Sequence, residues 1–275
     1  LIGNGSDEIL DLIFRAFCTP NKDEVLLMPP TYGMYAVLAN INSIAISEVP
    51  LDKDFQLDTA AILKAVKPNT KALFFCSPNN PSGNLFRESA IKALLAGFEG
   101  VVVIDEAYID FTSINSWSTI LNEYPQLIVT QTLSKAFGLA GLRLGIAIAH
   151  PEIIQLLHNI KPPYNINTLS QQNAIEALQD TKGYDTQIQT LIAERKRLAD
   201  ALGTVTWVKH IFPSDANFLL IRVDDANKRY ANLLEQHIVV RNRSTQQNCE
   251  NTLRISVGTP KENDLLIAAC KSLQL

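Results

Sequence analysis

Residues 132–143, TLSKAFGLAGLR, connect two aliphatic segments of the chain, 127–133 and 144–149. Both segments are expected to be buried strands, because strands covered on both faces are continuous aliphatic runs. Ligands of open α/β sheets bind just beyond the ends of such strands. The stretch therefore predicts an α/β fold with a ligand site beside Lys135.

Outward from this stretch, short β-branched runs alternate with amphipathic segments, which is typical of an α/β protein with a mostly parallel sheet. Ser6 and Asp7 are expected to cap a first helix whose apolar residues recur at helical spacing as far as Phe17. Further strands are expected at 25–28, 44–49, 71–76 and 101–105, and further helices at 32–40, 57–66 and 88–98.

The proline-rich segment 161–164, KPPY, interrupts this regular alternation. We predict a large domain over residues 1–165, connecting helices over 166–204 and a smaller C-terminal α/β domain over 205–275. In the smaller domain, two helices, one of them at 262–273, are expected to flank strands at 205–210, 218–223, 238–241 and 252–257.

The composition excludes several classes of protein. Of the 275 residues, 47% are hydrophobic and 19% are charged, which indicates a folded chain rather than a disordered one. The net charge of −4 disfavours a surface for nucleic acid or anionic lipid. The longest runs of Val, Ile and Leu, such as Val101 to Ile104, span four residues, whereas a membrane span needs about 20.

Cysteine and histidine show no pattern of their own. The four cysteines include no CxxC pair and are expected to be reduced, buried thiols of a cytoplasmic protein. The four histidines have no metal-ligand spacing, so no metal site is expected.

Lys135 by itself could be an ordinary surface charge. It follows an apolar strand, however, and a partly desolvated lysine can have a lowered pKa and form a Schiff base with a carbonyl. Thr132, Ser134 and Arg143 suit a phosphate, with two hydroxyl donors and one guanidinium group. A carbonyl and a phosphate on one ligand point to pyridoxal 5′-phosphate.

Four further side chains fit that cofactor, and two of them, Asp105 and Asn80, should lie on the same rim as Lys135. Asp105 ends the most aliphatic strand and could pair with a protonated pyridine nitrogen, or could cap the next turn. Asn80 and Tyr108 could reach the 3′ oxygen of the ring, although Asn80 alone could be a plain turn residue. Tyr32 could stack on a flat heterocycle or pack in the core.

The segment 3–8, GNGSDE, predicts an anion-binding turn before the first helix. Glycines allow a tight turn, and the free N–H groups of a first helical turn point at an anion. A glycine-rich turn before a helix is common, so this segment is informative only together with the others.

Taken together, these segments resemble the fold-type I aminotransferases that depend on pyridoxal 5′-phosphate, and among them the histidinol-phosphate aminotransferases. The segment PPTYGMY is what favours that branch. The matching segments are GNGSDE (3–8), PPTYGMY (29–35), SPNNPSG (77–83), DEAY (105–108), SKAFGLAGLR (134–143) and LRISVG (253–258).

The resemblance implies roles for individual residues. Lys135 would bind the cofactor as a Schiff base and move a proton between the substrate Cα and C4′. Asp105 would pair with the ring nitrogen and Tyr32 would stack on the ring. The remaining roles are hydrogen bonds to the 3′ oxygen from Asn80 and Tyr108, and phosphate binding by the amides of Ser6 and Asp7 and the side chains of Ser134 and Arg143.

Two arginines of the smaller domain are candidates for substrate binding. Arg254 lies in an apolar strand and Arg241 ends the strand before it, where each could also form a plain salt bridge. A guanidinium group matches both phosphate and carboxylate. The pair could therefore serve two amino donors in turn.

The resemblance implies transamination of L-histidinol phosphate with 2-oxoglutarate, giving imidazole-acetol phosphate and L-glutamate, by a cytoplasmic homodimer of histidine biosynthesis. Alternatives on the same scaffold are an aromatic or aspartate-type aminotransferase and a threonine-phosphate-type decarboxylase. A non-catalytic regulatory module that binds the same cofactor is a more remote one. In the family an N-terminal arm against the partner subunit precedes the glycine-rich turn, so the chain is expected to be N-terminally incomplete.

Overall fold

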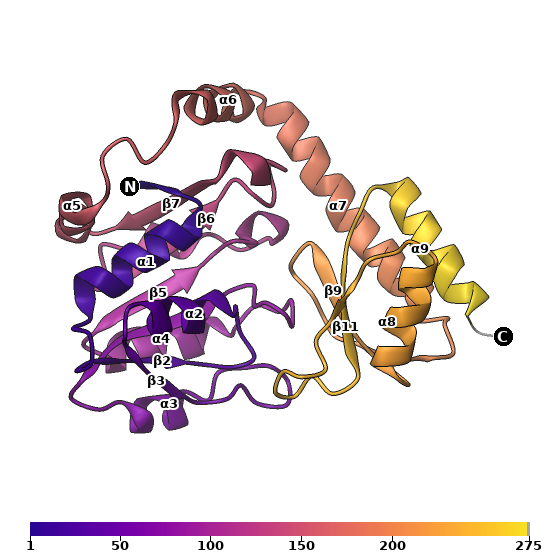
Figure 1. Ribbon diagram of the computed structural model, residues 1–275, viewed down its shortest axis with the longest axis horizontal. Coiled ribbons are helices and arrows are strands. Elements are labelled where there is room, and N and C mark those ends of the chain that lie inside the picture. The colour runs from indigo at the N-terminus through magenta and orange to yellow at the C-terminus, as the bar shows by residue number, and fades with distance from the viewer. Residues whose placement is uncertain (274–275) are drawn as a thin grey trace.

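Seven strands form a mixed sheet in the computed structural model, which describes residues 1–273 (Figure 1). The order is β1-β7-β6-β5-β4-β2-β3; β2 to β6 pair in parallel, whereas β7 is antiparallel to both β6 and β1. This arrangement confirms the expected, mostly parallel sheet. The strands are β1 (Ile2–Asn4), β2 (Glu24–Leu27), β3 (Ala45–Glu48), β4 (Thr70–Cys76), β5 (Val101–Asp105), β6 (Leu127–Thr132) and β7 (Leu144–Ala149).

Helices cover both faces of this sheet. Successive strand residues point to opposite faces, so Phe74 packs in one core with α1 and α2, while Leu73 and Phe75 pack in another with α3 and α4. The helices are α1 (Ser6–Phe17), α2 (Met34–Ile41), α3 (Thr59–Ala65), α4 (Glu88–Gly97) and α5 (Pro151–Ile160), with short 3-10 helices η1 (Ile109–Phe111), η2 (Trp117–Ile120) and η3 (Ala140–Leu142).

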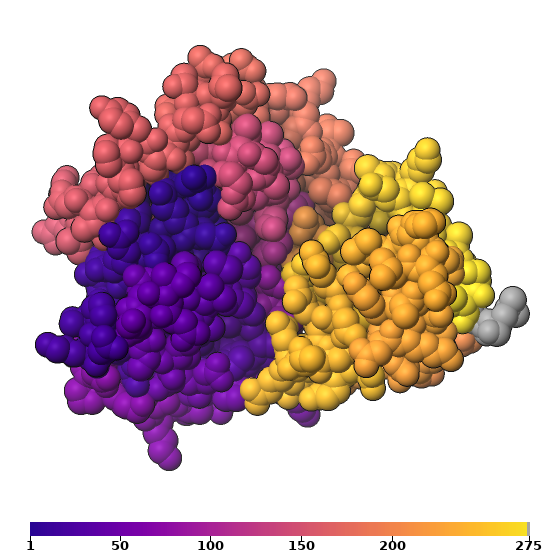
Figure 2. All heavy atoms as spheres, viewed as in Figure 1, coloured from indigo at the N-terminus to yellow at the C-terminus, as the bar shows by residue number. Residues whose placement is uncertain are grey.

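A second, antiparallel sheet in the order β10-β11-β9-β8 forms beside the first. It has its own core around Trp207 and Leu253, and the long helix α7 runs between the two parts (Figure 1). Figure 2 shows this part, in orange and yellow, as a lobe beside the indigo and violet one. Its elements are β8 (Val208–Ile211), β9 (Phe218–Val223), α8 (Ala226–Glu235), β10 (Arg241–Asn242), β11 (Thr252–Ser256) and α9 (Pro260–Ser272), reached through α6 (Thr168–Gln179) and α7 (Thr181–Leu202).

Two expectations about local structure were wrong, and two elements were not anticipated. Gly5, with φ 78°, is the N-cap of α1, and Ser6 and Asp7 lie within its first turn instead of capping it. The strand expected at 238–241 is reduced to Arg241–Asn242, and Val239 is 69% exposed. Helix α5 and strand β1 were not anticipated; β1 exists because it pairs with β7, a contact between distant parts of the chain.

The predicted limits of the domains stay a prediction, and the end of the last one, 274–275, lies outside the described residues. Within residues 1–273, no helix combines the length and apolar character needed to cross a bilayer.

Candidate active site

A pocket of about 600 Å³ lies at the carboxyl ends of β4, β5 and β6. Strands β4 and β5 end level with one another, because Cys76 pairs with Asp105 in the parallel register, and β6 continues past Thr130, the partner of Asp105, to Thr132. The expected meeting of side chains on one rim is therefore confirmed. All the predicted site residues line the pocket: Ser6, Asp7, Tyr32, Asn80, Asp105, Tyr108, Thr132, Ser134, Lys135, Arg143, Arg241 and Arg254.

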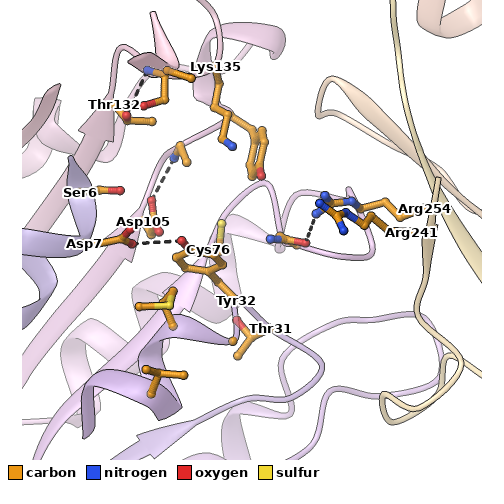
Figure 3. A pocket seen from close by; sticks show the side chains of 18 of the residues that line it. Ser6, Asp7, Thr31, Tyr32, Cys76, Asp105, Thr132, Lys135, Arg241 and Arg254 are labelled. Atoms are coloured by element: carbon orange, nitrogen blue, oxygen red, sulfur yellow. Dashed lines mark hydrogen bonds between the residues drawn. The ribbon is translucent and has the colours of Figure 1, made fainter. Parts of the chain in front are cut away.

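Lys135 points into this pocket from the turn after β6 (Figure 3). Its Nζ lies 5.7 Å from the centre of the Tyr108 ring. Desolvation by the pocket walls, and next the charge of Arg254, lower the pKa of the amine, while Asp105 and Cys76 oppose that shift. A larger share of neutral amine makes Lys135 a better nucleophile and base.

Asp105 is 2% exposed and lies at the floor of the pocket. Its Oδ2 accepts a hydrogen bond from Tyr35 Oη at 3.0 Å, and its Oδ1 accepts one from the Ala107 amide at 3.1 Å. No cationic side chain of residues 1–273 forms an ion pair with it. Burial raises the pKa of this carboxyl to about 6.

Tyr35 was missed in the sequence. It is fully buried in α2 and packs on Phe74, so its position in an apolar helix is typical of a core residue. Tyr32 lies just before α2 and Tyr35 lies in its first turn, three positions later, and the two rings meet edge to face with their centres 5.5 Å apart. That spacing was the one signal available.

Tyr32 contacts Asp7, which in turn lies close to Arg143 at the pocket wall. Its hydroxyl donates to Asp7 Oδ1 at 3.0 Å, which ties the segment before α2 to the start of α1 (Figure 3). The Asp7 carboxylate also lies 3.7 Å from Arg143 Nη2. The ring of Tyr32 is half-buried, so it presents a flat face to the pocket.

The other end of the pocket can bind an anion. Helix α1 begins here and no side chain caps it, which leaves N–H groups of its first turn for a ligand. Arg143, left-handed at φ 54°, accepts a hydrogen bond from the Gly5 amide through its carbonyl at 2.9 Å. This backbone contact accompanies a guanidinium group that lies against Gly5 and near Asp7 at the pocket wall.

The hydroxyl groups of Thr132 and Ser134, both expected to bind a phosphate, differ in their contacts. The Thr132 hydroxyl donates to the Leu144 carbonyl at 3.1 Å and accepts from the Ser134 amide at 3.1 Å. Its proton is thus committed to the backbone, and the hydroxyl holds the turn in shape. The Ser134 hydroxyl lies at the pocket surface.

Asn80 and Arg254 meet across the two lobes. Arg254 Nη1 donates to Asn80 Oδ1 at 2.6 Å, and the guanidinium carbon lies 4.9 Å from the centre of the Phe218 ring. Because its oxygen is occupied, the Asn80 amide can offer its N–H groups to a ligand. Tyr108 is 6% exposed and packs edge-on against Phe218.

Arg241 enters the pocket beside Arg254, opposite Asp105 (Figure 3). Two more lining residues, Arg243 and Gln246, were missed in the sequence. The alternation Arg241-Asn242-Arg243 was the available signal, since residues two apart on an extended segment share a face.

The family model that matches residues 1–269 is that of the class I and II aminotransferases. The chain belongs to this family, as its two lobes and the Lys135–Asp105 site indicate. An enzyme of the aminotransferase class is thereby confirmed.

Known relatives narrow the assignment. A histidinol-phosphate aminotransferase of Flavobacterium johnsoniae is 54% identical over 99% of this chain and 78% of its own length. The crystal structure of the enzyme of that name from Clostridium acetobutylicum superposes with a TM-score of 0.92 at 26% identity, over 100% of this chain and 83% of the other. The one from Sinorhizobium meliloti, in complex with pyridoxal 5′-phosphate, shares the fold, with a TM-score of 0.90 at 24% identity over 99% and 76% of the two chains. Within its family the chain belongs to the histidinol-phosphate aminotransferases.

The cofactor is pyridoxal 5′-phosphate, as expected. The residues present fit this cofactor. The buried Asp105 has no cationic partner among residues 1–273, and a protonated ring nitrogen would supply one. The uncapped start of α1 lies in the same pocket, where it can bind the cofactor phosphate. Among residues 1–273 no cluster of side chains could hold a metal ion.

Proposed function

We propose that this chain transfers the amino group of L-histidinol phosphate to 2-oxoglutarate, giving imidazole-acetol phosphate and L-glutamate, as a step of histidine biosynthesis. The relatives that are 54% identical bear the name of this activity. The observation that carries the chemistry is Asp105, a buried carboxylate without a cationic partner, in the same pocket as Lys135.

Bound pyridoxal 5′-phosphate supplies an aldehyde for the amino group and a ring that spreads the charge developing at the substrate Cα. Asp105 holds a proton on the ring nitrogen, and the Tyr35 hydroxyl keeps its carboxylate in place. Lys135, when its amine is free, takes the proton from the substrate Cα and delivers it at C4′.

The other residues orient the ligands. The amides of Ser6 and Asp7, with Ser134 and Arg143, bind the cofactor phosphate at the start of α1. Thr132 supports them through the backbone.

The remaining contacts hold the cofactor ring and the substrate. Tyr32 stacks on the ring, while Asn80 and Tyr108 bind its 3′ oxygen. Arg241 and Arg254 bind the anionic groups of the two amino donors.

The test uses the chain loaded with pyridoxal 5′-phosphate and mixed with histidinol phosphate, without any keto acid. We expect the visible absorption band of the bound cofactor to be lost as the amino group is transferred. The variant Lys135→Ala should not perform this half-reaction. The variant Lys135→Arg keeps the positive charge but has no amine that could take up and deliver the proton, so it should not perform it either.

Other outcomes identify the alternatives. A response to glutamate but not to histidinol phosphate would indicate an aromatic or aspartate-type aminotransferase. Release of CO₂ from a phosphorylated amino acid would indicate a decarboxylase. Binding of the cofactor without reaction of any amino donor would favour a regulatory module.

A cytoplasmic homodimer is part of the proposal. The four cysteines are free and buried, which supports a reducing compartment. Tyr164, Leu169, Ile175 and Leu178 are between 50% and 97% exposed along one short part of the chain, and exposed apolar side chains gathered in this way mark interaction surfaces. Sedimentation of the chain should give twice the monomer mass, and Leu169→Gln with Ile175→Gln should reduce it to the monomer.

A further inference from the structure

Arginines of the C-terminal lobe form a cluster of three at one wall of the pocket. Arg241 and Arg254 are direct partners in the antiparallel β10–β11 pair, so their side chains leave the sheet on the same face. The Arg243 amide continues this pairing by donating to the Thr252 carbonyl at 2.9 Å. Arg243 therefore shares the face of Arg241, and all three line the pocket.

No carboxylate compensates this positive charge. None of the three guanidinium groups forms an ion pair with an acidic side chain in the described part of the chain. The Nε atoms of Arg243 and Arg254 are buried without a hydrogen-bond partner. Like charges opposite one another destabilise a strand pair, so the cluster is arranged for an anion that comes with the ligand.

The three arginines are not equivalent. Arg254 is anchored by Asn80 at 2.6 Å and by the ring of Phe218, and its charge acts on Lys135. Burial lowers the pKa of Arg254, and so do the charges of Arg243 and Arg241. Neither Arg241 nor Arg243 has a side-chain hydrogen bond among residues 1–273, so both remain free to bind a ligand.

The two amino donors place their anions at different distances from the reacting carbon. In glutamate the α-carboxylate is attached directly to Cα and carries one charge. In histidinol phosphate a CH₂ group and an ester oxygen separate Cα from phosphorus, and the phosphate carries up to two charges. An inner guanidinium group meets the carboxylate, whereas the phosphate extends further out and has oxygens for more than one guanidinium group.

From this geometry we propose that Arg243 is a specificity-determining residue, which together with Arg241 forms an outer subsite that selects the phosphate dianion of one amino donor over the carboxylate of the other. The inference rests on the proposed function, since that function supplies the two donors. Arg254 binds the anion of both donors, and Arg243 binds the phosphate of the phosphorylated donor.

The test compares the wild-type chain loaded with pyridoxal 5′-phosphate with Arg243→Gln and Arg243→Lys. Arg15→Gln, at the exposed end of α1 and outside the pocket, is the matched loss of one charge. Each half-reaction is followed with histidinol phosphate and with glutamate separately. Calorimetric titration of the same loaded proteins with inorganic phosphate gives a readout independent of turnover.

We expect Arg243→Gln to lower kcat/KM for histidinol phosphate about 10- to 100-fold, mainly through KM, because a charged hydrogen bond is lost. The value for glutamate should change less than about 3-fold, which is below the loss of one such bond. Binding of inorganic phosphate should weaken as binding of histidinol phosphate does. Arg243→Lys should recover part of the loss, since it restores the charge without the planar fork.

Equal losses for both donors in Arg243→Gln, or phosphate binding unchanged by the substitution, would overturn the inference and leave the proposed function standing. A wild-type chain that reacts with glutamate but not with histidinol phosphate would instead overturn the proposed function. In that case, the titration with inorganic phosphate would still test the outer subsite. If Arg243→Gln weakens phosphate binding, the result supports a phosphorylated substrate of another kind. If Arg243→Gln leaves phosphate binding unchanged, a phosphorylated substrate is excluded.

Discussion

Arg254 Nη1 lies 2.6 Å from Asn80 Oδ1 and so connects a strand of the C-terminal lobe to the turn after β4 of the large sheet. Residues 174 positions apart thereby share one polar contact at the pocket. The contact holds the guanidinium group at the pocket, where we propose that it binds the substrate, and it leaves the N–H groups of Asn80 available to the cofactor.

Replacing Arg254 by lysine should impair both amino donors. Lysine keeps the charge but cannot hold Asn80 and a bidentate anion together, so we expect kcat/KM to fall about 100-fold for glutamate and for histidinol phosphate. Separate half-reactions measure this. A loss confined to one donor would show that Arg254 is not the shared arginine.

Asp105 should make the cofactor-free chain less stable as pH rises. Its pKa of about 6 lies above the usual 3.8, so between these values the folded chain holds a proton that the unfolded chain has lost. The free energy of unfolding from this group therefore falls through that window and levels off above pH 6.

Asp105→Asn removes this titratable group, so a comparison with wild type measures its contribution to the free energy of unfolding. The stability of the variant relative to wild type, both without cofactor, should increase by about 2 kcal/mol between pH 4 and pH 7. Urea unfolding at several pH values gives the difference. A constant difference across this range would show that the carboxyl titrates normally. The same variant, however, should bind pyridoxal 5′-phosphate about 100- to 1000-fold more weakly, because a buried charge pair is lost.

Tyr35→Phe tests the hydroxyl that holds Asp105. A hydrogen bond to a charged group contributes about 1.5–3 kcal/mol, so the cofactor-free variant should lose about that much stability at pH 8. The loss should shrink at pH 4.5, where the carboxyl is protonated. Combining Tyr35→Phe with Asp105→Asn should remove this pH dependence; if the pH dependence persists, it arises elsewhere.

Gly145 allows β7 to approach the start of α1. A Cβ there would lie 2.3 Å from the Ser6 amide nitrogen and 2.4 Å from the Gly5 carbonyl carbon, both of them backbone atoms that cannot easily move. Gly145→Ala should therefore destabilise the chain by about 1–3 kcal/mol and weaken cofactor binding by displacing Ser6.

Gly141→Ala is the matched control, because nothing lies within 4 Å of the position its Cβ would take. Its stability should stay within about 0.5 kcal/mol of wild type. Thermal unfolding and titration with pyridoxal 5′-phosphate compare the two variants. Equal effects of the two substitutions would show that the close approach at Gly145 is not what matters.

Much of the fold could be predicted because its strands are buried on both faces. Segments such as Val101–Asp105 are aliphatic up to their last residue, so their positions do not depend on distant partners. The N-cap of α1 could not be predicted in the same way, since Gly5 takes its role from the backbone bond to Arg143. Strand β1 likewise exists only through its pairing with β7.

The sequence by itself determined the class of the fold, the cofactor and the reactive groups, because Lys135 and Asp105 stand directly at the ends of strands that must be buried. Only the tertiary structure decided which groups hold these two in place. Tyr35 reaches Asp105 over 70 residues, and Arg241 meets Arg254 through the strand register. Such contacts depend on the packing of distant segments, and no local pattern of residues encodes them.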